Sequence, residues 1–340
     1  MSTPKTEIPT RRLGRSGLTV SRLCLGTMMF GARADEAEAG RIVSAAAERG
    51  VNFIDTADTY AGGRSEEIVG RLLEGRRDDF VLATKVANPN GAGANRSGLS
   101  RKWLFEEVPA CLKRLRTDNV DILYLHKEDP DTPIEETVRA LGDLQRAGMI
   151  RHFGVSNFRA WRMAAFVAMC DAQGVARPIV CQPMYHALNR AAETEIIPAA
   201  RHFGLGVVAY SPLARGVLTG KYRPGADAPP DSRAGRGDKR ILQSEFRPEM
   251  LRVAEAIAEH ARAKRQEPAA FALAWALANP NLTGLIAGPR SLEQWEGYLR
   301  ALAVDISPED ERLIDGLVPP GTSAEKVADP AYPAEGRDHA

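Results

Sequence analysis

Four polar side chains follow short apolar segments of the sequence, at the points where β-strands would end. Asp55 closes the segment NFID, Lys85 closes FVLATK and His126 closes VDILYLH. Tyr60 follows in the loop after Asp55. Each residue alone has an ordinary structural explanation, as a turn cap, a half-buried aromatic ring, a lysine that reaches solvent or a core histidine. The combination is more informative, because strands that lie side by side would bring these four side chains to one place.

Together, the four residue types fit acid–base chemistry on a carbonyl group. A carbonyl that accepts a hydride develops negative charge on oxygen and needs a proton donor. Tyrosine, whose ordinary pKa is about 10, supplies a proton poorly at neutral pH. A nearby ammonium favours tyrosinate and lowers that pKa, and a carboxylate keeps the ammonium charged and fixed. A histidine could then hydrogen-bond the substrate oxygen and orient it.

The elements that could bring these residues together are predicted along almost the whole chain. Short β-branched segments alternate with longer amphipathic segments, which is the pattern of parallel strands joined by helices. The sequence therefore predicts an α/β protein with the fold of a (β/α)8 TIM barrel, whose active site lies at the carboxyl ends of the strands. The eight predicted strands are Leu23–Gly26, Asn52–Thr56, Phe80–Lys85, Val120–His126, Ile150–Ser156, Ile179–Gln182, Gly206–Tyr210 and Leu282–Ala287.

Further elements are expected around this barrel. The segment RRLGRSGLTVSRL before the first strand predicts an N-terminal β-hairpin that could plug one barrel end. Ser65, Ser100 and Thr132 each precede an amphipathic segment and are candidate helix N-caps. Pro133 would be the first helical residue of the third such segment, and Gly148 would follow its end. The amphipathic segments Met250–Lys264 and Pro268–Ala278 both lie between the last two strands, so extra C-terminal helices are expected.

We expect one folded domain. Residues 1–10 are interpreted as a flexible N-terminal tail, residues 11–318 as a single barrel domain and residues 319–340 as a polar, loosely held C-terminal tail. The segment RPGADAPPDSRAGRGDKR after Tyr222 is rich in Gly, Pro and charge, which is typical of a mobile loop.

The composition argues against several classes of protein. The 340 residues include 45 Lys and Arg and 44 Asp and Glu, a formal net charge of +1, so no overall field attracts nucleic acid or an anionic membrane. A small-molecule partner is expected instead. The four cysteines form no CxxC pair and lie in or beside apolar stretches, which indicates reduced, packed thiols. No stretch approaches the roughly 20 apolar residues of a membrane span, and the N-terminus lacks the apolar region of a signal peptide. We therefore expect a cytoplasmic protein, with a homo-oligomer left open.

Several long segments of the chain resemble the aldo-keto reductase family. They are NFIDTADTYAGGRSEEIVGRLL, DDFVLATKVA, CLKRLRTDNVDILYLHKEDPDTPIEETVRALGDLQRAGMIRHFGVSNF and GVVAYSPLARGVLTGKY, and they occur in the family's order. The resemblance implies an NADP-dependent enzyme that reduces aldehydes or ketones. It also implies that Tyr60 is the general acid, that Lys85 and Asp55 tune it, and that His126 positions the carbonyl group. All four of these positions are intact.

The resemblance also implies where NADPH would be held. No GxGxxG sequence follows a strand, so a Rossmann site is not indicated. Ser156, Asn157 and Gln182 would bind the nicotinamide carboxamide, and Tyr210 would stack on the ring unless it is an ordinary strand-end aromatic. The residues implied at the pyrophosphate are Ser211, Leu213, Gly216 and Lys221, and further implied cofactor contacts are Thr27, Met28 and Asp55.

The segment LIAGPRSLEQWEGYL resembles the family's adenosine-binding segment, with Gly288, Arg290, Ser291 and Gln294 at cofactor positions. A planar guanidinium suits a 2′-phosphate, and no acidic residue lies between Ile286 and Leu292, so NADPH is expected in preference to NADH. Gly297 and Tyr298 replace the Glu and Asn usual near the end of this motif. Tyr298 could pack against the adenine or simply cover the helix.

A substrate pocket is expected from Met28, Met29 and Phe30, from Tyr60, and from the loop that starts at Asn88. Two other functions compete with carbonyl reduction. A metal-dependent barrel hydrolase would need several ligands, but only His126 of the six histidines clearly ends a strand, so no metal is expected. A cofactor-binding regulatory or redox-sensing subunit with little turnover is the second, because relatives of the family include such subunits.

Overall fold

The computed structural model describes residues 7–325. Eight parallel strands form a closed barrel in the order β10-β3-β4-β5-β6-β7-β8-β9, and two short strands before them, β1 and β2, form an antiparallel hairpin. The predicted TIM barrel and hairpin are therefore confirmed. The strands are β1 Thr10–Arg12, β2 Thr19–Ser21, β3 Leu23–Gly26, β4 Phe53–Asp55, β5 Val81–Val86, β6 Val120–Leu125, β7 Ile150–Ser156, β8 Val180–Gln182, β9 Gly206–Ala209 and β10 Gly284–Ala287.

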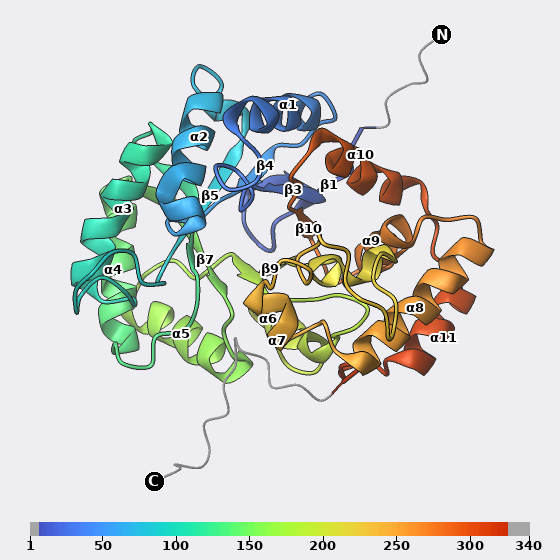
Figure 1. Ribbon diagram of the computed structural model, residues 1–340. Helices are drawn as coiled ribbons and strands as arrows, with labels where there is room; N and C mark the ends of the chain where they lie inside the picture. The colour runs from blue at the N-terminus through green and yellow to red at the C-terminus, as the bar shows by residue number, and fades with distance from the viewer. Residues whose placement is uncertain (1–6, 326–340) are drawn as a thin grey trace. The chain divides into compact units, whose positions relative to one another are not determined.

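Helices connect successive strands of the barrel. In Figure 1, helices α1 to α5 lie outside the strands β3 to β7 that precede them. This placement leaves the apolar faces of the helices against the sheet, as barrel packing requires. The helices are α1 Glu36–Ala47, α2 Arg64–Leu72, α3 Arg101–Leu115, α4 Ile134–Arg146, α5 Ala160–Gln173, α6 Ile196–Phe203, α7 Lys239–Gln243, α8 Pro248–Ala263, α9 Pro268–Ala278, α10 Leu292–Arg300 and α11 Pro308–Leu317.

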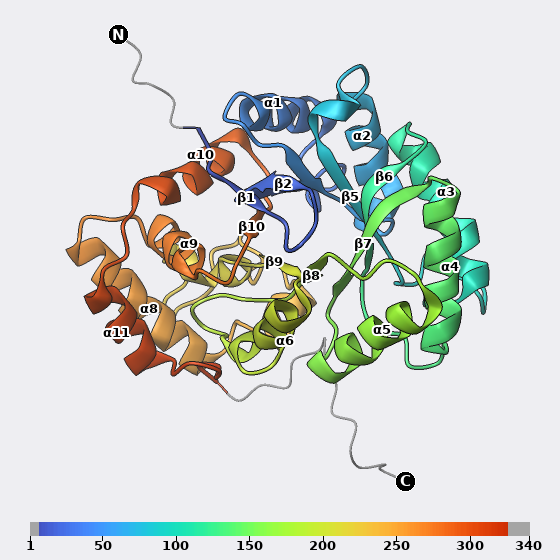
Figure 2. The same cartoon turned by 180° about the vertical axis from the view of Figure 1, so that it is seen from behind.

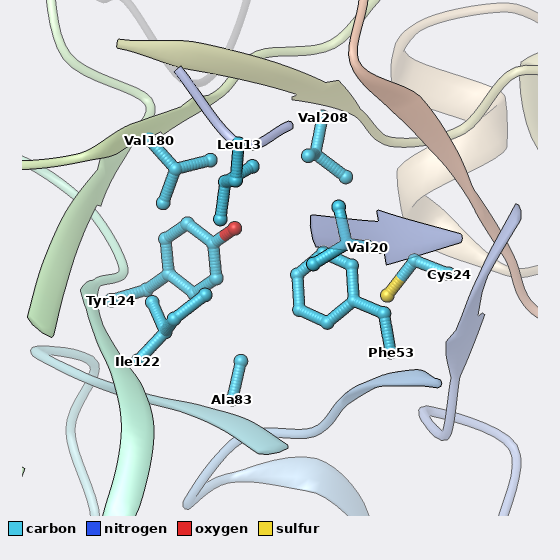
Figure 3. Packing of buried hydrophobic residues seen from close by; sticks show 9 residues of the cluster. All are labelled: Leu13, Val20, Cys24, Phe53, Ala83, Ile122, Tyr124, Val180 and Val208. Carbon is cyan, nitrogen blue, oxygen red and sulfur yellow. The ribbon is translucent and has the colours of Figure 1, made fainter. Parts of the chain in front are cut away.

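The interior of the barrel is filled by side chains from the strands and from the hairpin. Figure 3 shows Phe53 and Tyr124 packed together with the smaller side chains of this cluster. Leu13 and Val20 reach it from the hairpin, which is seen from behind in Figure 2. Gly14 has a φ of 57°, and a Cβ there would lie 2.4 Å from the backbone nitrogen of Gly206, so glycine permits the close approach of the hairpin. The hairpin thus closes the barrel interior, as its sequence suggested.

The chain separates into two compact units. The first contains residues 1–183, 199–208 and 281–295 and includes all the barrel strands apart from the last residue of β9. The second contains residues 184–198, 209–280 and 296–340, with helices α7, α8, α9 and α11. Within it, the Asp310 carboxylate accepts hydrogen bonds from Lys264, which follows α8, and from the backbone of Ser307, the N-cap of α11, and these bonds join the two helices. Residues 1–6 and 326–340, which belong to the two predicted tails, lie outside the described residues.

Three predictions about local structure are corrected. Ser65 is the second residue of α2 and not its N-cap, which is Gly63. Thr132 does not cap α4, since its hydroxyl donates to Asp129 and Pro133 occupies the N-cap position. The α9 segment is buried on almost every side and is not amphipathic. At the start of the predicted C-terminal tail, the backbone of Arg190 donates to Thr322 and that of Ala324 donates to Leu188. The Ser100 cap is confirmed by its bond from the Trp103 backbone.

Candidate active site

Lys85, Asp55 and Tyr60 meet at the carboxyl ends of β4 and β5. These two strands pair in parallel, with Asp55 opposite Ala83, so both side chains are carried to the same end of the barrel. The Lys85 ammonium forms a buried ion pair with Asp55 and donates to the Thr56 carbonyl at 2.9 Å. The same nitrogen lies 3.2 Å from the Tyr60 hydroxyl oxygen. Lys85 is 0% exposed and Asp55 is 1% exposed, so the ammonium contacts groups of the site and has no contact with solvent.

The charge on Lys85 is maintained despite its burial. Removal from water disfavours an ammonium and lowers its pKa, but the charges and hydrogen bonds of Asp55 and Tyr60 outweigh this effect. The pKa of Lys85 is therefore raised above its ordinary value. A permanently charged ammonium next to a phenol oxygen stabilises the tyrosinate form. The geometry thus provides the arrangement that a tyrosine proton donor needs.

Tyr60 is held by an unusual turn at the start of α2. The residues after it, Ala61, Gly62 and Gly63, all have left-handed backbone conformations, with φ values of 50°, 65° and 92°. A non-glycine residue in this region costs free energy, and such residues concentrate at functional sites. The turn leaves the ring of Tyr60 half-buried, with its centroid 6.1 Å from that of His126 in an edge-to-face arrangement.

His126 follows β6 directly and is fixed through its backbone. Its N–H donates to the Val86 carbonyl at 2.9 Å, and its carbonyl oxygen accepts from the Asn157 amide at 2.8 Å. The ring nitrogen Nδ1 lies 3.0 Å from the Asn88 side-chain nitrogen. The structure therefore brings all four predicted catalytic residues together within the first unit.

Asn88 and Asp58 are site residues that the sequence analysis did not identify as chemical groups. Asn88 was expected only to begin a loop of the substrate pocket, although its position soon after Lys85, at the same strand end, was an available signal. Asp58 lies two residues before Tyr60, and its backbone N–H donates to the Lys85 carbonyl at 3.1 Å.

The side chain of Asp58 is an exceptional buried acid. It is 0% exposed, and neither carboxyl oxygen accepts a hydrogen bond from a side chain among residues 7–325. Nearby, Glu66 and Glu107 share the Arg114 guanidinium, at 2.6 and 2.5 Å. Burial, together with the charges of these two glutamates, raises the pKa of Asp58 to about 8. Asp58 is therefore largely protonated at neutral pH.

The residues implied at the nicotinamide carboxamide form a connected network. The Gln182 amide nitrogen donates to the second oxygen of Asp55 at 2.9 Å, and the Ser156 hydroxyl donates to the Gln182 backbone carbonyl at 2.9 Å. The Asn157 amide nitrogen also reaches the Ser156 hydroxyl at 3.2 Å. Since Asn157 bonds the His126 carbonyl and Gln182 bonds Asp55, these residues support the catalytic group directly.

The loop after β3 differs from its expected role in one respect. Phe30, expected in a pocket wall, is 0% exposed and belongs to the core, whereas Met28 and Met29 are half-buried. The Thr27 hydroxyl is buried and lies 3.1 Å from the Asp55 carbonyl oxygen, to which it donates. It also lies 2.8 Å from the Ser65 hydroxyl. These contacts explain why Ser65 is buried inside α2 and does not cap it.

The start of α10 carries the residues implied at the adenosine end. The Arg290 backbone N–H donates to the Gln294 side chain at 3.0 Å, and the Gln294 backbone donates to the Ser291 hydroxyl at 3.3 Å. The next amide, that of Leu292, donates to the Glu38 carboxylate of α1 at 2.6 Å. Inspection of residues Ile286–Leu292 alone could not find this acid, because it lies 254 positions away in the sequence.

In the second unit, the segment from Tyr210 to Lys221 contains several residues in left-handed backbone conformations. Ser211, Ala214, Arg215 and Gly216 all have positive φ values, 56°, 48°, 52° and 99° respectively. A Cβ on Gly216 would meet the Lys221 ammonium nitrogen at 2.8 Å, so this cation lies close to the loop backbone. Two of the loop's N–H groups are used within it, because Ala214 donates to the Ser211 carbonyl and Gly216 to the Leu213 carbonyl, both at 2.8 Å. Leu213 immediately precedes the 3-10 helix of this loop.

The same unit gathers arginine side chains next to this loop. Arg215 forms an ion pair with the buried Glu245. Burial, and the nearby charges of Arg215 and Arg240, lower the pKa of Arg233, although Asp238 opposes this effect. Arg233 falls in the segment predicted to be a mobile loop, where its partial burial was not anticipated.

Other features bear on alternative functions. All four cysteines are buried and unpaired, in agreement with the expected packed thiols. Among the described residues, no three His, Cys, Asp or Glu side chains come together in a way that could hold a metal ion. Within residues 7–325, no helix is both long enough and apolar enough to cross a membrane.

Comparison with known proteins gives consistent matches over most of the chain. The sequence model of the Aldo/keto reductase family matches residues 22–319. An uncharacterised oxidoreductase of Bacillus subtilis, YrpG, is 38% identical over 319 residues, which is 90% of this chain and 95% of the relative. A probable voltage-gated potassium channel subunit beta of Arabidopsis thaliana is 40% identical over 304 residues, covering 88% of this chain and 92% of the relative. A putative subunit of the same name from Schizosaccharomyces pombe is 33% identical over 328 residues, with 92% and 93% covered.

Proposed function

Because the chain belongs to the aldo/keto reductase family, we propose that it is an NADPH-dependent oxidoreductase that reduces aldehydes or ketones to alcohols. The observation that supports this proposal most strongly is the contact of one buried ammonium, that of Lys85, with both Asp55 and the Tyr60 hydroxyl. A lysine with 0% exposure has no solvation benefit, and its position is explained if it tunes a tyrosine acid.

In this proposal, each of the four side chains has a separate role in proton transfer to the carbonyl oxygen. NADPH supplies the hydride when it is bound. Tyr60 donates its hydroxyl proton to the carbonyl oxygen as negative charge develops there, and Lys85 stabilises the tyrosinate that remains. Asp55 holds the ammonium in place, and His126 orients the carbonyl oxygen through a hydrogen bond. In the reverse direction, tyrosinate would accept a proton from an alcohol.

The residues of the chain fit a nicotinamide cofactor in their chemistry. Ser156, Asn157 and Gln182 provide amide and hydroxyl groups for a carboxamide, and Tyr210 provides an aromatic ring for stacking. The Lys221 ammonium, which lies close to the backbone at Gly216, suits a pyrophosphate. Thr27 and Met28 are proposed as further contacts at the catalytic end, beside Asp55.

The preference for NADPH over NADH is a separate part of the proposal. Arg290, Ser291 and Gln294, which follow Gly288, would receive the 2′-phosphate at the start of α10. Glu38 opposes this preference, because its carboxylate already accepts the Leu292 amide.

The experiment that tests the proposal follows nicotinamide absorbance with a panel of aldehydes, ketones, sugars and secondary alcohols. We expect turnover with NADPH, and a loss of about 10³-fold or more in kcat for Tyr60→Phe, because general acid catalysis contributes effects of that order. NADPH affinity, measured by fluorescence titration, should be retained in the variant. An active Tyr60→Phe enzyme would contradict the assignment of the acid.

A second candidate function is supported by the relatives named as potassium channel β subunits. Under this alternative, the chain binds NADPH as a regulatory or redox-sensing subunit and turns over little substrate. Single-turnover kinetics separates the two functions, since a regulatory subunit would oxidise bound NADPH slowly with every carbonyl compound of the panel. The presence of all four catalytic residues favours an enzyme.

A further inference from the structure

The loops after β5 and β6 bring two side chains into a specific contact beside the catalytic group. The Asn88 side-chain nitrogen lies 3.0 Å from Nδ1 of His126. Both residues are half-buried at the carboxyl end of the barrel. The contact links a residue that the sequence placed only in a pocket wall to the ring that is proposed to bind the substrate carbonyl.

The backbone fixes Asn88 in this position. Ala87, the residue before it, is 0% exposed and has a φ of 144°, a conformation that a residue with a side chain rarely adopts. The Ala87 carbonyl accepts the Gly98 N–H at 2.8 Å, which closes the base of the loop. Within the loop, the Asn90 amide donates to Glu107 at 2.9 Å. This loop is therefore anchored on both sides of Asn88.

His126 is equally constrained. Its backbone N–H donates to Val86, and its carbonyl accepts from Asn157, so the residue is tied to both neighbouring strands. The Asn88 contact is thus formed between two groups whose positions are set by the barrel. It fixes the ring of His126 in addition to its backbone.

The chemistry of this contact decides which ring nitrogen carries the proton. An amide nitrogen donates hydrogen bonds and cannot accept them, so the ring nitrogen that faces it must be unprotonated. A neutral imidazole with an unprotonated Nδ1 carries its hydrogen on Nε2. An Nε2–H group can donate to a carbonyl oxygen, whereas the other tautomer would present a lone pair to it.

We propose that Asn88 is a positioning residue that holds His126 in the Nε2–H tautomer, so that this histidine donates a hydrogen bond to the substrate carbonyl oxygen. The purpose of the contact rests on the proposed carbonyl reduction. The tautomer itself is a property of the free protein and can be measured whether or not a substrate is found.

The direct test is nuclear magnetic resonance of the protein with 15N-labelled histidine, with His126 signals assigned by their loss in His126→Gln. Long-range 1H–15N correlations distinguish a protonated from an unprotonated ring nitrogen. We expect Nε2 to be protonated and Nδ1 to be unprotonated in the wild type. In Asn88→Asp, the carboxylate can only accept a hydrogen bond, so Nδ1 should become protonated and donate to it. A wild-type protein with its hydrogen on Nδ1 would overturn the proposal, because Asn88 would then face the ring with its oxygen.

Kinetics tests the consequence for the reaction. Asn88→Asp should lower kcat by about 100-fold, which is typical for loss of one donor to a developing oxyanion, and should change the Kd for NADPH by less than about twofold. The control is Asn119→Asp, the same substitution just before β6, at the opposite end of the strand from His126, which should leave both values unchanged. A loss of kcat in Asn88→Asp without a change of tautomer would refute the positioning role. If the wild type has the expected tautomer but reduces no carbonyl compound, the proposed function is refuted. The assignment of Asn88 as the residue that sets the His126 tautomer would then still hold.

Discussion

Replacement of Asp58 by asparagine tests the buried carboxyl group beside the Tyr60 turn. The pKa of this group is raised from 3.8 to about 8, because it is buried and lies near Glu66 and Glu107. A raised pKa means that folding favours the protonated acid. The stabilising effect of the protonated form is complete below the unfolded-state pKa and is lost as the pH rises through the folded-state pKa. Asp58→Asn is close to isosteric and never ionises, so the variant should not lose this stability.

The magnitude follows from the size of the shift. Each pH unit between the two pKa values changes the free energy of unfolding by about 1.4 kcal/mol. From pH 5 to pH 8, the difference between variant and wild type should therefore move in favour of the variant by up to about 4 kcal/mol. At any single pH, the difference in unfolding free energy also includes the cost of burying the asparagine amide in the variant. The change of this difference with pH is therefore the quantity that tests the pKa of Asp58.

The assay is urea unfolding followed by circular dichroism at pH 5, 6, 7 and 8. Asp78→Asn, at an exposed position of the same unit, is the matched control and should give a curve parallel to the wild type. If the Asp58→Asn curve is also parallel to the wild type, then Asp58 is not a perturbed acid. The interpretation of the cluster formed with Glu66, Glu107 and Arg114 would then be wrong.

Three further substitutions test the tuning of the acid and the cofactor preference. Lys85→Met removes the ammonium that favours tyrosinate, so the pH profile of alcohol oxidation should move to higher pH and the rate should fall; an unchanged profile at near-normal rate would contradict the role of Lys85. Arg290→Ala should weaken NADPH binding about tenfold or more and NADH binding little, as titrations with both cofactors would show, whereas equal losses would argue against a 2′-phosphate contact. Glu38→Gln retains an acceptor for the Leu292 amide but removes a negative charge, so NADPH should bind several-fold more tightly while NADH affinity stays constant; no gain would show that the Glu38 charge does not reach the cofactor.

The sequence predicted the barrel and its catalytic group well because both depend on local patterns. The predicted strands Leu23–Gly26 and Ile150–Ser156 have the same bounds as β3 and β7. Apolar segments flanked by turn residues indicate both ends of a strand, so these bounds can be read from the local sequence. Asp55, Lys85 and His126 could be placed in one site because parallel strands carry their terminal residues to the same end of a barrel.

The residues that the sequence did not reveal depend on partners far along the chain. Ser65 looked like a helix cap, but Thr27 and Thr56 draw its hydroxyl into the barrel wall. Asp58 carried no expectation from the sequence, and only folding buries its carboxyl group near Glu66 and Glu107. The contact between Glu38 and Leu292 forms only when the last helical crossover lies next to the first. No local pattern encodes such neighbours.

The hydrogen bonds around Gln182 have a consequence for ligand discrimination. Gln182 donates to Asp55, the Ser156 hydroxyl donates to a backbone carbonyl, and the Asn157 amide donates to two acceptors of the protein. If these residues bind the nicotinamide group as proposed, most of their hydrogens are already committed, and the ligand meets mainly side-chain oxygens. Such a surface attracts an –NH2 group and repels a carboxylate. The protein would then distinguish an amide cofactor from its deamidated acid by the polarity of one small surface, with no steric difference between them.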